Sequence, residues 1–159
     1  MYRNILVPVD GSETSLRGLS EAIALGRTQG SVLTLVHIVN EFVFDYSYSP
    51  ASYGAGIIDS LRERGRAVLA DAAVRVRAQG LEPLTVLLES IGGPAADLIV
   101  AQARESQADL IVMGTHGRRG LRRIALGSDA EQVVRMSEVP VLLVRRQEAA
   151  DALHPRAAA

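Results

Sequence analysis

Short apolar runs alternate with longer amphipathic segments along almost the whole chain, and this alternation limits the possible folds. Such runs are typical of strands buried on both faces, and the segments between them carry apolar residues at helical spacing. The predicted strands cover residues 5–9, 32–39, 84–88, 109–113 and 140–144. The predicted helices lie between Ser12 and Gly30, from Ile57 to Ala78, from about Pro94, and over residues 128–137. Strands that alternate with helices form βαβ units, so we expect an α/β protein with a parallel sheet.

A strand, a loop rich in glycine and a helix start follow one another over residues 109–134. The loop carries the pattern G-x2-G-x9-G-S, formed by Gly114, Gly117, Gly127 and Ser128. Glycine lets a backbone approach an anion closely, and the N–H groups at a helix start attract negative charge. Ser128 can cap the helix and donate its hydroxyl to a phosphate oxygen. The pattern predicts a phosphate site; the alternative is a surface loop before a capped helix.

The same segment, together with both ends of the chain, resembles the universal stress protein family, in the subclass that binds ATP. Residues 4–12, NILVPVDGS, resemble that family's first strand and turn, and residues 139–144, VPVLLV, resemble its last strand. The resemblance covers about residues 1–146, which we expect to form one domain, with residues 147–159 as a loose tail. It implies a flavodoxin-like or Rossmann-like doubly wound, five-stranded parallel sheet in the order 3-2-1-4-5, with helices on both faces.

In a sheet of that order the ligand crevice lies outside the carboxyl ends of the first and fourth strands. Pro8, Val9 and Asp10 end the first predicted strand, and the glycine loop follows the fourth. Two motifs far apart in the chain therefore point to the same edge of the sheet. The resemblance implies that Asp10 lies beside the ribose or a phosphate-bound Mg²⁺. An aspartate at such a position is otherwise a turn former.

The resemblance implies binding of ATP, together with Mg²⁺, by one set of residues: Pro8, Val9, Asp10, Val39, Met113, Gly114, Gly117, Gly127, Ser128 and Asp129. Val9 and Val39 would surround the adenine or bond to it through backbone atoms; the alternative is that they only fill the strand core. Asp129 departs from the family pattern, which has an aliphatic residue after the serine. A carboxylate is favourable at a helix start, but here it would lie near the γ-phosphate and repel it, or help to hold a cation.

Residues 40–56 interrupt the alternation and hold most of the aromatic residues: Phe42, Phe44, Tyr46, Tyr48 and Tyr53. Two interpretations stay open for this predicted loop. It buries its own rings against the domain, or it forms a lid or partner surface beside the ligand. His37 lies within an apolar run, so we expect a buried histidine with a hydrogen-bond partner, and the three histidines show no metal-binding spacing.

Composition limits the chemistry. A formal net charge of −1 gives no electrostatic argument for a nucleic-acid or membrane partner. Cysteine is absent, and all 17 basic residues are arginine, which excludes thiolate chemistry, a Walker-type lysine and a Schiff base. No apolar run is long enough to span a bilayer, and the N-terminus does not look like a signal peptide, so we expect a cytoplasmic protein.

Three functions remain open at this stage. The first is an ATP-binding regulatory protein of the stress response. The second is a slow ATP-hydrolysing enzyme, although the first turn lacks the S-G-G-x-D-S loop of the ATP pyrophosphatases and no catalytic residue is assigned. The third is a dimeric interaction module that does not use nucleotide. Val141–Val144 is short, apolar and at a predicted sheet edge, and family members commonly dimerise through this strand, so we expect a homodimer.

Overall fold

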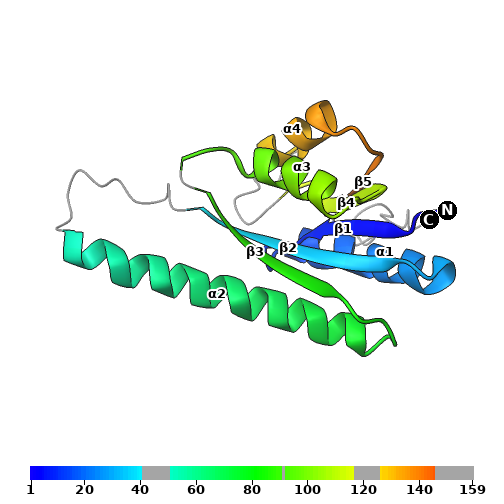
Figure 1. The fold of residues 1–159 in the computed structure, drawn as a ribbon, viewed down its shortest axis with the longest axis horizontal. Helices are drawn as coiled ribbons and strands as arrows, with labels where there is room; N and C mark the ends of the chain where they lie inside the picture. The colour runs from blue at the N-terminus through cyan, green and yellow to red at the C-terminus, as the bar shows by residue number, and fades with distance from the viewer. Residues whose placement is uncertain (41–50, 91, 117–125, 146–159) are drawn as a thin grey trace, which may run out of the picture.

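The computed structural model describes residues 1–40, 51–90, 92–116 and 126–145, with the backbone alone for 51–55. Strands and helices alternate through these ranges, as predicted (Figure 1). In chain order they are β1 (Asn4–Pro8), α1 (Glu13–Gln29), β2 (Val32–Asn40), α2 (Ala51–Arg77), β3 (Leu84–Ser90), α3 (Ala95–Glu105), β4 (Leu110–Gly114), α4 (Ser128–Met136) and β5 (Val141–Val144). The predicted loose tail, residues 147–159, lies outside the described residues.

The strands form one five-stranded parallel sheet in the order β3-β2-β1-β4-β5, which confirms the predicted fold class. The chain moves outward from β1 to β2 and β3, and then crosses back to place β4 and β5 on the other side of β1. Helices α1 and α2 cover one face of the sheet, and α3 and α4 cover the other (Figure 1). The strand order therefore reverses between β1 and β4, where their carboxyl ends lie side by side.

Each face of the sheet packs its own apolar core. Successive side chains of a strand point to opposite faces, so Val7 belongs to the core under α1 and α2, and Leu6 to the core under α3 and α4. Leu19 and Val76 complete the first core, and Val133 is fully buried in the second. This two-sided burial explains why the strands read as continuous apolar runs rather than as alternating ones.

Local sequence signals set the ends of the first elements, although β1 ends one residue before the predicted Val9. Pro8 is the last residue of β1. Ser12 caps the start of α1, since its side-chain oxygen accepts a hydrogen bond from the Ser15 N–H at 3.2 Å. Gly30 ends α1 in the left-handed conformation, with φ of 69°.

Helix α2 begins six residues earlier than predicted, at Ala51 rather than Ile57. Gly54 and Gly56 argued against a helix there, but extending an existing helix adds one hydrogen bond per residue. The N-terminal end of α2 consequently projects past the end of the sheet (Figure 1). Part of the predicted aromatic loop is thus helical, and residues 41–50 lie outside the described residues. Within the described ranges, no helix has the length and apolar character that a bilayer crossing requires.

Candidate functional site

The turn after β1 is built from Asp10, Gly11 and Ser12. One carboxylate oxygen of Asp10 accepts a hydrogen bond from the Ser12 N–H at 2.9 Å, and Gly11 has a φ of 79° that favours glycine. The Asp10 N–H donates to the Ser15 hydroxyl at 3.4 Å. Asp10 is therefore a turn former, and its carboxylate lies at the start of α1, at the carboxyl edge of the sheet.

The first turn of α1 rests directly on the end of β4. A Cβ at Gly114 would lie 2.8 Å from the carbonyl carbon of Thr14, and one at Gly18 would lie 3.3 Å from the Gly114 nitrogen. The Thr14 hydroxyl donates a hydrogen bond to the His116 carbonyl oxygen. The two sequence motifs therefore meet at one edge of the sheet, as predicted. Close packing against the backbone of α1 also explains why residue 114 is a glycine, without any phosphate.

The start of α4 is tied to the same short segment after β4. The Gly127 N–H donates to the Thr115 carbonyl oxygen at 2.8 Å, and a Cβ at Gly127 would lie 3.0 Å from that oxygen. The Thr115 N–H donates in turn to the Val144 carbonyl oxygen on β5 at 2.9 Å. Residues 114–116 therefore connect α1, α4 and β5.

Ser128 does not cap α4, which corrects the prediction. Gly127 occupies the N-cap position and has no side chain with which to cap the helix, and Ser128 is the first helical residue. Ser128 and Asp129 are both exposed. The sequence argument chose serine as the better capping residue, but the close approach of the preceding residue to Thr115 favours a glycine there. The N-cap residue therefore supplies no side-chain acceptor to the first N–H groups of α4, which lie at the positive end of the helix dipole.

The apolar members of the predicted set lie in the strand core. Val9 and Val39 are each 3% exposed and Met113 is 6% exposed. The Val9 N–H donates to the Val36 carbonyl oxygen at 2.8 Å, and the Val9 carbonyl oxygen is 2.6 Å from Nδ1 of His37. The prediction of a buried, hydrogen-bonded His37 is thus confirmed. The Val9 N–H already donates a hydrogen bond within the sheet, to β2.

Part of the predicted site cannot be placed. Gly117 lies outside the described residues, as do the loop arginines Arg118, Arg119, Arg122 and Arg123. In the part of the chain that the structure describes, no three histidine, aspartate or glutamate side chains gather in an arrangement suited to a metal ion.

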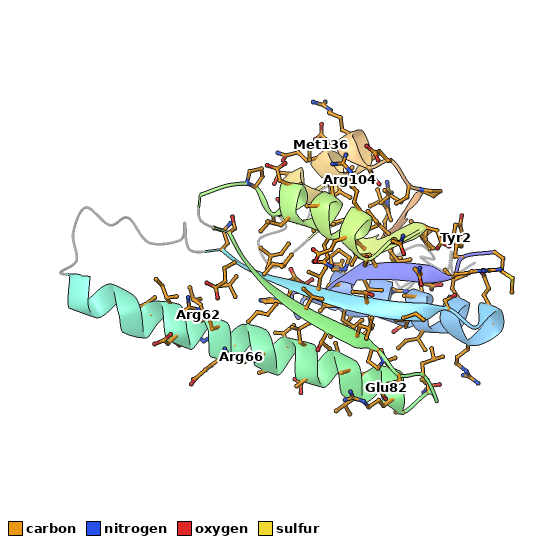
Figure 2. All side chains as sticks on the ribbon, viewed as in Figure 1. Tyr2, Arg62, Arg66, Glu82, Arg104 and Met136 are labelled. Atoms are coloured by element: carbon orange, nitrogen blue, oxygen red, sulfur yellow. The ribbon has the colours of Figure 1, made fainter. Side chains whose placement is uncertain are left out.

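Sequence reasoning missed a cavity of about 410 Å³ at the opposite edge of the sheet. Its walls come from the end of α3 and from the segments that precede β4 and β5: Val100, Ala103, Arg104, Gln107, Ala108, Ser137, Glu138 and Val139. Arg104, which Figure 2 labels on α3, forms an exposed ion pair with Glu138 at 2.7 Å. Apolar periodicity does not indicate such a hollow, because it forms between the end of a helix and two segments that lie apart in the chain.

A doubly wound sheet with two helix starts at its reversal point defines a broad class of nucleotide-binding folds. The family model described as "Universal stress protein family" matches residues 1–145, and the chain belongs to this family. It is 34% identical over 146 residues to universal stress protein MJ0531 of Methanocaldococcus jannaschii, covering 92% of this chain and 84% of that protein.

Solved structures of related proteins share the fold. That of MJ0577, a universal stress protein of the same archaeon, has a TM-score of 0.80 at 28% identity and covers 94% of this chain and 99% of that one. A universal stress protein from Archaeoglobus fulgidus in complex with dAMP has a TM-score of 0.65 at 26% identity, covering 90% and 98%. The structure of a universal stress protein in complex with cAMP has a TM-score of 0.65 at 29% identity, covering 90% of this chain and 97% of that one. Some structural neighbours therefore bind adenine nucleotides.

Proposed function

We propose that this chain binds an adenine nucleotide, ATP in particular, at the carboxyl ends of β1 and β4, and acts as a nucleotide-dependent regulatory protein in the stress response. The observation that carries the proposal is the meeting of two helix starts on residues 114–116, with a glycine at the N-cap of α4 that has no side chain to bond to the first N–H groups. Two aligned helix starts favour a polyanion. Relatives in complex with cAMP and dAMP support an adenine nucleotide as that anion.

In this proposal the phosphates bind at the start of α4. Gly127 brings the backbone close, the N–H groups of the first turn donate to phosphate oxygens, and the exposed Ser128 hydroxyl adds a donor. Gly114, at the end of β4, would leave room for the phosphates beside the backbone, and Gly117 stays a predicted member of the site. Mg²⁺ bound with the ATP would neutralise phosphate charge, and Asp10 at the start of α1 offers it a carboxylate.

The base and ribose would bind on the β1 and β2 side of the same edge. Pro8, Val9, Val39 and Met113 lie at or near the ends of β1, β2 and β4, and would form an apolar support for the adenine. Since the Val9 N–H already bonds within the sheet, Val9 would contact the base by packing. Asp129 would face the terminal phosphate. No catalytic residue is assigned, and the cytoplasmic location and the end of the domain at residue 146 stay predictions.

Titration calorimetry on protein stripped of nucleotide tests this function, with ATP, AMP and cAMP as ligands, each with and without Mg²⁺. Ser128→Ala removes a hydrogen bond to a charged group and should weaken ATP binding about tenfold. Ser20→Ala, at another exposed helix serine, should leave it unchanged. Absence of binding at millimolar ATP would favour the nucleotide-independent module. Turnover that disappears in Asp10→Ala would favour the ATPase.

We also propose that two chains form a homodimer through β5. This strand is the last one in the sheet order, so one of its edges carries backbone groups that a second strand could pair with. Leu142 is 39% exposed there, although it lies in an apolar strand. A second copy of β5 would cover that side chain.

A further inference from the structure

We propose that His37 is a positioning residue for the candidate site: its ring holds the Val9 carbonyl and so fixes the direction in which the backbone enters the Asp10 turn. Its effect on ligand binding rests on the proposed nucleotide site. Its effect on the turn does not, and can be measured without any nucleotide.

The hydrogen bond defines the state of the ring. His37 lies on β2, is 7% exposed, and places Nδ1 2.6 Å from the Val9 carbonyl oxygen. A carbonyl oxygen can only accept, so Nδ1 must carry the proton and donate. In a neutral ring the other nitrogen, Nε2, then has no proton. The contact with Val9 therefore selects one of the two tautomers.

The bond acts at the point where the sheet ends and the candidate site begins. β1 ends at Pro8, opposite Val36, and the following carbonyl, that of Val9, is held by a side chain. The Val9 carbonyl and the Asp10 N–H belong to one planar peptide unit. Holding the first therefore orients the second, which donates to the Ser15 hydroxyl in α1.

Helix α2 keeps the ring in place from the other side. A Cβ at Gly65 would lie 2.8 Å from Cδ2 of His37 and 2.7 Å from Cδ1 of Leu87. Glycine is a poor residue for a helix interior, and the ring explains why one is present here. Arg62 and Arg66, on either side of Gly65 in the chain, lie on the same stretch of α2 (Figure 2). His37 is thus clamped between α2 and the turn that carries Asp10.

The first experiment uses the nucleotide-free protein. Nitrogen-15 spectra of the imidazole rings should show one ring in the Nδ1–H tautomer, and that signal should be missing in His37→Asn. With three histidines in the chain, the assignment is direct. If the His37 ring instead carries its proton on Nε2, the proposed hydrogen bond does not exist and the proposal fails.

The second experiment separates positioning from packing. Asn can place an amide donor close to the position of Nδ1, whereas Leu fills the space without a donor. In the amide spectra, Asp10 and Gly11 should shift in His37→Leu and stay near the wild-type positions in His37→Asn. ATP affinity should fall about tenfold in the Leu variant and stay within about threefold in the Asn variant.

A control addresses general loosening of the contact with α2. Leu87→Ala removes packing from the same place but no donor, so it should lower stability and leave ATP affinity unchanged. Equal losses of affinity in the Asn and Leu variants would reduce His37 to a packing role and overturn the proposal. If the wild type binds no nucleotide, the proposed function fails, and the shifts of Asp10 and Gly11 still decide whether His37 positions the turn.

Discussion

Gly114 stands where any side chain would collide with the backbone of α1. Its Cβ would lie 2.8 Å from the Thr14 carbonyl carbon and 3.0 Å from the Ser15 nitrogen, and backbone atoms of a packed helix cannot easily move away. We expect Gly114→Ala to lower the free energy of unfolding by about 1–3 kcal/mol. Urea denaturation measures this. Gly93→Ala is the control, since its Cβ would meet no atom within 4 Å; equal effects of the two variants would contradict the argument.

The sequence could identify Gly114 as a special position but could not identify Thr14 as its packing partner. A glycine at the end of an apolar run suggested a phosphate loop, because that is the local reason for glycine in such a position. The packing reason comes from Thr14, which lies far away in the chain and reaches Gly114 only through the fold. Ser128 shows the same limit: residue preference named it as the cap, and the Thr115 contact gives that position to Gly127.

The negative charge of Asp129 should affect the affinity for ATP. It is exposed in the first turn of α4, where the proposed site places the terminal phosphate. Two like charges a few ångströms apart in water repel by about 1 kcal/mol, so Asp129→Asn should strengthen ATP binding roughly fivefold. Calorimetry with and without Mg²⁺ measures this, and Glu105→Gln, an exposed acid on α3, is the control. Weaker binding in the variant, seen only with Mg²⁺, would mean that Asp129 helps to hold the cation.

Among the elements, α2 is attached to β3 by a charged contact near the carboxyl edge. Arg62 donates to both carboxylate oxygens of Glu89, at 2.7 and 2.8 Å, and also to Asp59 at 2.9 Å. The hydrogen bond to Glu89 raises the pKa of Arg62, and the same bond lowers the pKa of Glu89 below its ordinary value of 4.5. This contact holds the N-terminal half of α2 beside the sheet.

A lowered carboxyl pKa means that the contact stabilises the fold above the ordinary glutamate value, and that this contribution disappears as the pH falls through the lowered pKa. Glu89→Gln should therefore be less stable than the wild type at pH 7, and the difference should shrink below pH 4.5. We expect a modest effect, since Arg62 and Glu89 are each 34% exposed. Thermal unfolding across this pH range measures it, with Glu63→Gln as the control. A difference that persists at low pH would contradict the assignment.

The beginning of α2 shows why element ends resist prediction. Apolar spacing indicated the helix from Ile57 onward. Gly54 and Gly56 have low helix propensity, so the sequence did not indicate the first turns. Helix α1 was predicted closely because capping residues mark both of its ends, Ser12 at the start and Gly30 at the end. When no capping residue marks the start of a helix, the position of the start depends on how far the helix extends from its interior.

For the whole molecule, the sheet has two edge strands, β3 and β5, and the dimer proposal uses only one of them. We expect the wild type to sediment as a dimer at micromolar concentration. Leu142→Arg places a charge within the proposed interface and should give a monomer. Leu84→Arg, at a 58% exposed position on the other edge, should remain a dimer. A monomeric wild type, or dissociation by Leu84→Arg alone, would contradict the proposed interface.

The type and number of the described strands followed from their short apolar runs, which are typical of strands in a parallel sheet that is covered by helices on both faces. The order 3-2-1-4-5 did not, since apolar spacing carries no information on neighbours; it came from the family resemblance and is confirmed. The convergence of the two motifs then followed from the order. The contacts that join them, such as Thr14 to His116, depend on atomic packing and were not foreseeable.

Thr115 has both of its main-chain polar groups committed to different parts of the fold, the N–H to Val144 and the carbonyl to Gly127. These two hydrogen bonds restrict the backbone dihedral angles of Thr115, so small rotations there cannot compensate for a movement of α4. If α4 tilts when something docks at its first turn, either one of these two hydrogen bonds breaks or the outermost strand moves with it. Binding at the start of α4 would then change the position of β5, and a second chain paired with β5 would be affected by that change.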